Sequence, residues 1–398
     1  MEKLHQLIQQ YQELADFLRQ FRQERHRFPE LSNEEFETTA KIKSELEKHH
    51  ITILDLPLKT GLVAEIKGAK PGKTVMLRSD IDALPILEES GVPFSSEREG
   101  VMHACGHDFH LSAALGAAIL LKQHENKLEG TVRILFQSAE ETGLGALNVL
   151  KAGALKGVDA IFGLHNDPTL PVGTLGTKPH ALTAGVDRFE VHIHAKGAHA
   201  ARPQDGKDPI IVLAQVISSV QTIISRNVAT HENAVVSITH VQSGNTWNVI
   251  PDSAYLEGTV RTFNTEIRTQ IEQRFRTLLA GIAAAFEVSI ELEWHAGPPS
   301  VNNAEQWVPL TLEVAQAVGF EAKIVEASPI GEDFAFYQQE VPGVFVMVGS
   351  GGPYALHHPQ FRVDDDVLFP TAYYLAELAI QFLNQFMMNT SKSTVAHH

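Results

Sequence analysis

Apolar residues recur every three or four positions over residues 4–21, which is the spacing of one face of a helix. The apolar positions are Leu4, Ile8, Tyr11, Leu14, Phe17, Leu18 and Phe21. They predict one long amphipathic helix. Pro29 breaks the pattern, and Ser32 followed by Glu35 predicts a capping-box start for a second helix. His26 lies in the break, where we expect a structural role.

Short apolar runs typical of buried strands begin after Gly61 and alternate with helical segments. The runs cover residues 62–66, 74–77, 131–136, 158–164 and 344–348. Residues 109–121, rich in Ala and Leu, predict a buried helix. Buried strands that alternate with helices predict a largely parallel sheet, and in such sheets ligands bind beyond the carboxyl ends of the strands.

A different pattern occupies residues 185–295. Apolar and polar residues alternate from Phe189 to His194, as in a half-buried strand. His192 and His194 could form a metal-binding pair, but the polar face of a strand explains them more simply. The segment follows the order strand, helix, strand, strand, helix, strand, which predicts a ferredoxin-like sheet covered by two helices.

The predicted fold class is therefore α/β with two domains, and a chain of 398 residues is long enough for both. Residues 1–184 and 296–398 form the predicted α/β/α sheet domain. Residues 185–295 form the predicted inserted α+β domain.

Composition and net charge indicate which kinds of molecule the protein can bind. The formal net charge is −16, with 43% hydrophobic and 20% charged residues. An acidic surface disfavours nucleic acids and acidic membranes, which leaves small molecules as the expected partners. No apolar signal segment follows the N-terminus, and we find no apolar run near the ~20 residues of a membrane span. Since a single cysteine also excludes an internal disulfide, we expect a soluble, cytoplasmic protein.

Candidate chemistry is densest in the segment MHACGHDFH, residues 102–110. It holds the only cysteine, Cys105, together with His103, His107 and His110. Thiolate and neutral imidazole are the ligands that zinc and its first-row neighbours prefer. Two alternatives remain open at this point: Cys105 could be a nucleophile with a histidine base, or a buried small residue without chemistry.

Further polar residues follow the ends of separate apolar runs. They are Asp80, Asp82, Glu140, Glu141, His165, His357 and His358. Together with Cys105 and His107 they exceed the ligands of one tetrahedral metal, so they predict two metal ions. The terminal His397 and His398 are typical of a purification tag and are not counted as ligands.

Seven motifs in this chain resemble those of a known family. In order they are MHACGHD, QSAEE, GLHNDP, GAHAARPQDGKDPI, NVIPDSAYLEGTVRTF, GEDFAFY and LHHPQF. This set, from about His26 to Phe361, resembles the M20 metallopeptidases, in particular their amidohydrolase branch of N-acyl-L-amino-acid and hippurate hydrolases. The resemblance implies a catalytic α/β domain with two metals, interrupted by a smaller lid domain that also dimerises.

The resemblance also implies the roles of individual residues. The implied ligands of the two divalent ions are Cys105, His107, Glu141, His165 and His357. Glu140 is the implied general base. Successive residues of an extended chain point to opposite sides, so one of two adjacent carboxylates can bind metal while the other holds the water. The ions would be zinc, manganese, cobalt or nickel. The spacing Leu-His-x-Pro favours His357 over His358.

Four more residues receive implied roles. Asp82 would act in catalysis by orienting the metal ligands without binding metal itself. His199 would come from the partner subunit and donate to the oxyanion. Asn248 and Arg261 would hold the carboxylate of the substrate, since a guanidinium suits a planar anion. Arg261 could instead be a surface charge at the end of a strand.

The implied function is that of a metal-dependent amidohydrolase and homodimer. It would cleave N-acyl-L-amino acids, with N-acetyl or aromatic acyl groups, to a carboxylate and a free amino acid. A dipeptidase or carboxypeptidase of the same family would use the same ions. A metal-binding homologue without turnover is a further alternative, as is a cysteine-nucleophile amidase, which would be insensitive to chelation.

Overall fold

The computed structural model describes residues 1–395, so His397 and His398 lie outside the described residues. The chain divides into two compact units, and each is described by itself. The first comprises Met1–Leu182, Asn302–Glu326 and the chain from Asp333 onward, and the second comprises Thr183–Val301 and Ala327–Glu332. The predicted α/β fold class with two domains is confirmed.

The first unit is built on an eight-stranded mixed sheet. In spatial order its strands are β1 (Thr52–Ile53), β2 (Leu62–Lys67), β4 (Glu129–Gln137), β3 (Lys70–Asp80), β5 (Ala160–Asp167), β16 (Gly343–Gly349), β6 (Thr174–Thr177) and β15 (Glu321–Ile324). The four central strands β4, β3, β5 and β16 run parallel, as the buried apolar runs predicted. The antiparallel pairs of this sheet are β1 with β2, β2 with β4, and β6 with β16. The carboxyl ends of β3, β4 and β5 therefore meet at one edge.

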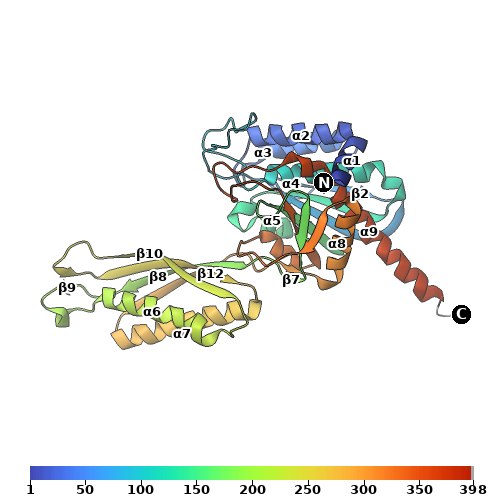
Figure 1. Ribbon diagram of the computed structural model, residues 1–398. Helices are drawn as coiled ribbons and strands as arrows, with labels where there is room; N and C mark the ends of the chain where they lie inside the picture. Colours follow the sequence, from blue (N-terminus) through green and yellow to red (C-terminus); the bar gives the residue numbers. More distant parts are fainter. Residues whose placement is uncertain (396–398) are drawn as a thin grey trace. The chain divides into compact units, whose positions relative to one another are not determined.

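Helices cover this sheet. They are α1 (Glu2–Gln10), α2 (Gln12–Arg27), α3 (Phe36–Lys48), α4 (His107–Gln123), α5 (Gly145–Lys151), α8 (Val308–Val318) and α9 (Leu368–Val395). The Ala-rich helix α4 is buried from His107 to Leu121 because it packs between β3, α9 and α2, and α2 runs along its outer side (Figure 1). A short antiparallel pair, β7 (His180–Ala181) and β14 (Asn302–Asn303), completes the unit.

The prediction of one long N-terminal helix is wrong, because the helix breaks at Tyr11 into α1 and α2. Tyr11 has φ −120° and ψ 36°, outside the helical region. Its ring centroid lies 5.4 Å from that of Phe369 and 5.7 Å from that of Tyr373. Packing of this aromatic ring against α9 accompanies the break, a tertiary contact that helical periodicity does not reveal.

The predicted capping box is also wrong. Helix α3 begins at Phe36, and the side chain of its N-cap residue Glu35 does not cap it. Glu35 Oε1 instead accepts a hydrogen bond of 2.8 Å from the backbone N of Ala139, and Ser32 Oγ donates to Asp82 Oδ2 at 2.7 Å. Both side chains therefore serve contacts with residues far away in the sequence.

The second unit contains an antiparallel four-stranded sheet with two helices on one face. In spatial order its strands are β10 (Ala234–Ser243), β12 (Ser253–Thr262), β8 (Gly185–His194) and β13 (Ser289–Ala296), and its helices are α6 (Pro209–Asn227) and α7 (Thr265–Phe286). A two-stranded ribbon joins β9 (Ala198–His199) to β11 (Val249–Ile250). The predicted ferredoxin-like order is confirmed.

Strand β8 shows the predicted alternation of buried and polar side chains. Phe189, Val191 and Ile193 are buried in the core of the unit. On the opposite face His192 Nε2 lies 3.6 Å from a carboxylate oxygen of Glu293, and a similar pair joins His194 to Glu291. These histidines thus occupy the polar face of a strand, the simpler of the two interpretations.

Helix α6 corrects the expectation that no apolar run approaches the length of a membrane span. Among the described residues it is the one helix long and apolar enough to cross a membrane, by length and composition only. Its residues Val212, Val216 and Val220 are buried in the core of the second unit. The helix therefore packs as the core helix of this unit.

Candidate metal centre

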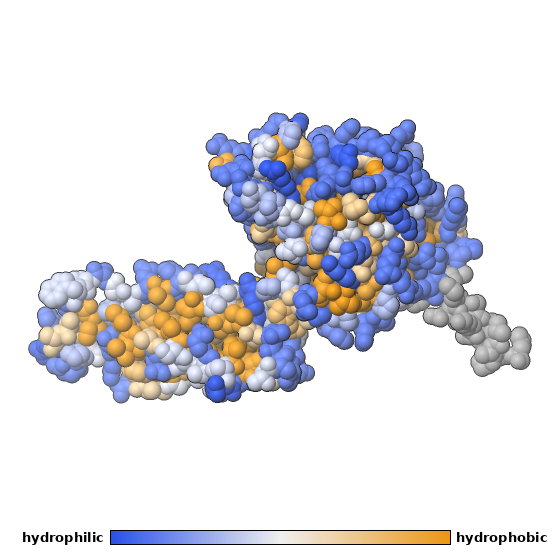
Figure 2. Space-filling view, in the orientation of Figure 1, coloured by the Kyte–Doolittle hydropathy of each residue, from blue (hydrophilic) through white to orange (hydrophobic). Residues whose placement is uncertain are grey.

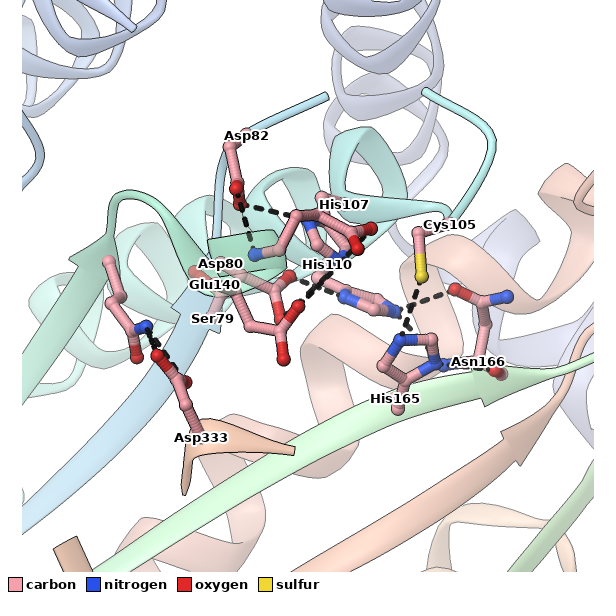
Figure 3. Close-up of polar contacts among 12 residues, drawn as sticks. Ser79, Asp80, Asp82, Cys105, His107, His110, Glu140, His165, Asn166 and Asp333 are labelled. Carbon is pink, nitrogen blue, oxygen red and sulfur yellow. Dashed lines mark hydrogen bonds and ion pairs between the residues drawn. The ribbon is translucent and has the colours of Figure 1, made fainter. Parts of the chain in front are cut away.

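The candidate centre lies at the carboxyl edge of the central strands of the first unit (Figure 3). Asp80 ends β3, and Glu140 begins a short 3-10 turn, Glu140–Thr142, after β4. Strand β5 continues to Asp167, so His165 lies within this strand and not at its end as the apolar run had indicated. The start of α4 adds His107 to the same edge.

The turn between Cys105 and His107 depends on Gly106. This glycine is the N-cap of α4 and has φ 89°, a left-handed conformation that side chains with a Cβ rarely adopt. A Cβ at this position would lie 2.1 Å from Oδ1 of Asn166. Glycine therefore permits both the turn and the close approach of Asn166, and the turn directs Cys105 and His107 toward one point.

Cys105, His107 and His165 form a first triad, whose potential ligand atoms all lie within 4.8 Å of one another. Cys105 Sγ lies 3.3 Å from His165 Nε2. Nδ1 of His165 donates to the backbone O of Asn166 at 2.7 Å, so Nε2 carries the lone pair that faces the sulfur. This arrangement suits a metal ligand, whose second ring nitrogen is usually held by a hydrogen bond.

Asp82 orients the ring of His107. Its Oδ1 lies 3.1 Å from Nδ1 of His107, and its Oδ2 accepts a hydrogen bond of 3.0 Å from the backbone N of Glu141. Nε2 of His107 then faces the carboxylates of Asp80, Glu140 and Glu141, at 3.8, 4.0 and 3.8 Å. Asp82 thus contacts two of the candidate ligands, as expected of an orienting residue.

Cys105, Glu141 and His357 form a second triad, which shares Cys105 with the first. Nε2 of His357 lies 3.4 Å from Oε1 of Glu141. His358 does not take this place, because its Nδ1 accepts from the backbone N of Gln360 at 3.0 Å and its ring stacks on Tyr354. The structure therefore brings all five sequence-predicted ligands together, with His357 in the predicted register.

Two residues, one beside the centre and one within it, adopt strained backbone conformations. Ala139, directly before the glutamate pair, has φ 57°, and His357 has φ 64°. Residues other than glycine seldom adopt this left-handed conformation, which costs roughly 1–3 kcal/mol and concentrates at functional sites. The strain coincides with the turns that aim Glu140, Glu141 and His357 at the centre.

The charges and unpaired atoms of the centre fit a cation. Burial raises the pKa of the Cys105 thiol and the Glu141 carboxylate raises it further, so a thiolate here needs a cation beside it. Nε2 of His107 and Oε1 of Glu141 are buried and have no hydrogen-bond partner among the described residues. A buried polar atom without a partner costs ~1–3 kcal/mol, which metal coordination would offset.

Three residues that surround the triads received no site role from the sequence. The sequence places Asp80 at the end of a strand, offers His110 only as an alternative ligand, and contains Asn166 within the motif GLHNDP. All three are buried, and His110 contacts both Asp80 and Asn166. Their contacts join β3, α4 and β5, which are far apart in the sequence, and only the position of each residue beside a motif hinted at them.

The other candidate histidines of the region lie outside the triads. His103 is buried, which lowers its pKa to about 3, and its ring centroid lies 6.4 Å from that of His26. His26 is buried as well, with Nδ1 2.9 Å from Asp108 Oδ2 and Nε2 3.1 Å from Glu88 Oε1. These contacts agree with the structural role expected for His26.

Three sequence-predicted site residues belong to the second unit: His199, the predicted oxyanion donor, and Asn248 and Arg261, the predicted substrate-binding residues. His199 in β9 pairs with Val249 in β11, and the backbone O of Asn248 accepts from Ala200 N at 3.1 Å, so His199 and Asn248 share one ribbon. Arg261 lies in β12, where its guanidinium donates to the backbone oxygens of Val260 and Pro329. No carboxylate lies within 4.0 Å of this guanidinium among the described residues.

The family of the chain follows from comparison with known proteins. A family model described as peptidase family M20/M25/M40 matches residues 76–381, more than half of the chain. The chain belongs to this family. The resemblance found in the seven motifs is therefore confirmed.

Two relatives with named activities and one solved structure are similar to this chain over most of its length. The chain is 50% identical over 360 residues to the N-acetylcysteine deacetylase of Bacillus subtilis, which covers 90% of this chain and 95% of that protein. It is 34% identical over 397 residues to thermostable carboxypeptidase 1 of Saccharolobus solfataricus, with 97% and 100% coverage. A crystal structure from Bacillus subtilis, described as a dinuclear metal binding peptidase from the M20 family, superposes with a TM-score of 0.85 at 46% identity, covering 94% of this chain and 99% of that one.

These relationships confirm the enzyme class. This M20 chain is a metal-dependent amidohydrolase, and its candidate ligands support two divalent cations. The open alternatives for Cys105, a nucleophile or a residue without chemistry, lose support, because the thiol stands at the junction of two triads of metal-ligating side chains.

Proposed function

We propose that this enzyme hydrolyses N-acyl-L-amino acids, with N-acetyl or aromatic acyl groups, to a carboxylate and a free amino acid. The observation that carries this proposal is the convergence of five metal-ligating side chains beside Glu140, in a chain half identical to an N-acetylcysteine deacetylase. N-acetylated amino acids, N-acetylcysteine included, are therefore the first substrates to test.

In this proposal the two triads would each hold one divalent cation, and Cys105 belongs to both triads. The ligands are Cys105, His107, Glu141, His165 and His357. When bound, the cations would polarise the amide carbonyl and lower the pKa of a water molecule toward neutrality. A thiolate favours zinc, while the mixed N, O and S donors also accept manganese, cobalt or nickel.

Glu140 is the proposed general base. Its Oε2 lies 4.0 Å from Nε2 of His107, and together with His107 and Glu141 it forms a further group of potential ligand atoms beside the two triads. A carboxylate at this place can accept the proton of the attacking water and later deliver it to the departing amine. Asp82 supports these steps by fixing His107 and the backbone of Glu141.

The second unit is proposed to bind the rest of the substrate. Arg261 is half-buried, and burial lowers its pKa, yet it has no carboxylate partner within reach among the described residues. A desolvated guanidinium of this kind can bind the carboxylate of the amino-acid product. Asn248 is proposed to assist it, and His199, exposed on the same ribbon as Asn248, is proposed to donate to the oxyanion of a partner subunit.

The enzyme is further proposed to be a cytoplasmic homodimer that pairs through the second unit. Strand β10 lies at the edge of its sheet and exposes Val235 and Val241, and an uncovered edge strand can pair with another copy. Figure 2 shows apolar side chains over the helices of this unit, where Ile210 and Ile211 of α6 are exposed. We expect neither nucleic acid nor membrane as a partner.

Peptide hydrolysis is the second candidate, favoured by the relative named as a carboxypeptidase. The deciding experiment measures free amine released from N-acetyl, N-benzoyl and N-indoleacetyl amino acids alongside dipeptides, before and after chelation and with each metal restored. Metal-dependent cleavage of the acyl amino acids alone would support deacylation, and cleavage of the dipeptides alone would replace it. Activity that survives chelation would contradict the proposed mechanism.

A further inference from the structure

A further group of potential ligands, Asp80, His107 and His110, shares His107 with the first triad. Spacing alone would allow it to hold a cation. The hydrogen bonds of Asp80 and His110 argue for a different role, because the polar atoms of both side chains are already engaged by other protein groups (Figure 3).

Both oxygens of Asp80 have protein partners. Oδ1 lies 2.6 Å from Nδ1 of His110, and Oδ2 accepts from Nη1 of Arg78 at 2.7 Å. Arg78 is itself held by Asp333 Oδ1 and Gln137 Oε1, each at 2.8 Å. All four side chains are buried, so Asp80 is fixed in place and keeps His110 oriented.

Both ring nitrogens of His110 are also occupied. Nδ1 faces Asp80, and Nε2 lies 2.9 Å from the backbone N and 2.7 Å from the side-chain Oδ1 of Asn166. A metal ligand needs a ring nitrogen with an available lone pair. His107 has one at Nε2, whereas His110 does not, so His110 connects Asp80 to Asn166.

Asn166 contacts both sides of the first triad. Its backbone O accepts from Nδ1 of His165 and thereby turns Nε2 of that ring toward Cys105. Its side chain occupies the space that a Cβ of Gly106 would need, directly against the turn between Cys105 and His107. Asn166 therefore follows His165 in β5 and also lies against the turn that carries the other two members.

We propose that Asp80, His110 and Asn166 form a positioning chain that holds His165 and Cys105 in register for one of the two cations. These residues do not bind metal themselves. The inference rests on the proposed metal ligands, and it goes beyond them by assigning residues that set the geometry of one ion. Loss of the chain should weaken the cation held by His165 more than the other.

The test is cobalt(II) binding by the apo form of the full chain. Co²⁺ bound to a thiolate gives a charge-transfer absorption that reports on Cys105 directly. In Asn166→Ala we expect the affinity for one of two ions to fall ~10–100-fold, the usual effect of losing a group that orients ligands, with a weaker thiolate band. The affinity for the second ion, whose triad also contains Cys105, should fall much less.

Asn303→Ala is the matched control. Asn303 is as buried as Asn166, and its Nδ2 donates to Thr177 Oγ1 and to the backbone O of Lys178, in the same unit and away from the triads. This variant should lose stability yet keep both cobalt affinities and the full thiolate band. A merely structural role for Asn166 predicts that the two variants behave alike.

His110→Phe is a second test of the proposal, in case Asn166→Ala does not fold. This substitution retains an aromatic ring and removes both ring nitrogens. It should show the same selective loss of one ion. Equal weakening of both ions, or an unchanged thiolate band in these variants, would overturn the inference. No substrate is used, so a failed substrate panel would leave this result intact. If the parent enzyme shows no thiolate band, Cys105 is not a metal ligand. The proposed positioning chain would then be wrong as well.

Discussion

Nδ1 of His107 lies 3.1 Å from Oδ1 of Asp82, and this contact leaves the other ring nitrogen, Nε2, facing the carboxylates of the metal centre. The pair has the geometry of a histidine ligand whose tautomer and ring orientation are set by a carboxylate. Asp82 also accepts from the backbone N of Glu141, so a single carboxylate orients one ligand from α4 and another from the turn after β4.

Asp82→Asn should therefore weaken metal binding without removing a ligand. We expect metal affinity to fall ~10–100-fold and activity to recover in excess metal, because the orienting contact is impaired while the donors remain. Metal content after dialysis and activity against added metal are the measurements. Asp187→Asn is the control, since Asp187 is equally buried but pairs with Arg268 in the second unit. Loss of activity that no metal concentration restores would contradict this role.

Glu140→Gln should separate catalysis from metal binding. The amide keeps the shape of the side chain but cannot accept the proton of water, so we expect turnover to fall at least ~10²–10⁴-fold while both metals stay bound. Glu141→Gln and Cys105→Ala should lose metal instead, because each removes a ligand atom from at least one triad. Metal analysis beside kinetics decides the matter. If Glu140→Gln loses as much metal as Cys105→Ala, the assignment of the base is wrong.

Alkylation distinguishes a metal ligand from a nucleophile at Cys105. With its cations bound, the enzyme should react slowly with iodoacetamide, since Cys105 is buried and its lone pairs would be engaged. Chelation should abolish activity before any alkylation occurs. The rate of alkylation and residual activity, with and without chelator, are the readouts. A cysteine-nucleophile amidase would show the reverse pattern, with activity retained after chelation and lost on alkylation.

Gly106→Ala should disturb the turn that aims Cys105 and His107. A left-handed conformation costs an L residue roughly 1–2 kcal/mol, and here the new methyl group would also meet Asn166. Gly153→Ala is the control for the backbone cost alone, because Gly153 has φ 77° and a Cβ added there would meet no atom within 4 Å. Urea unfolding should show a larger loss in Gly106→Ala, accompanied by metal loss that Gly153→Ala does not share. Equal losses would mean that contact with Asn166 is unimportant.

Much of this architecture is readable from the sequence because burial leaves a simple pattern. Runs such as TVRILF and VFVMV are typical of buried strands, and a parallel sheet brings the residues after them to one edge. The prediction that Glu140, Glu141 and His357 converge with Cys105 follows from that rule and from the motifs. The alternation of apolar and polar residues in β8 similarly indicates a half-buried strand of the ferredoxin-like unit.

The remaining features depend on contacts between residues far apart in the chain. The local pattern of Ser32 and Glu35 matches a capping box, but their partners are Asp82 and Ala139. A polar side chain that is buried must find a hydrogen-bond partner, and sequence spacing does not say which one. For the same reason the link from Asp80 through His110 to Asn166 has no local signature.

His26 should make stability depend on pH. Burial lowers the pKa of His26, but the Asp108 carboxylate and hydrogen bonds to Asp108 and Glu88 raise it more, so the net shift is upward from 6.5. The protonated ring is therefore favoured in the folded state, and its contribution to stability is fully present below about pH 6.5 and is lost as pH rises through the folded pKa.

In His26→Gln we expect a stability loss on the order of 1.5–3 kcal/mol at low pH, as for a hydrogen bond to a charged group. This loss should become smaller in alkaline buffer. Urea unfolding across this range measures it, with His5→Gln, an exposed histidine 3.7 Å from Asp366, as the control that should change little. A loss of equal size at every pH would show that His26 stabilises the fold as a neutral ring.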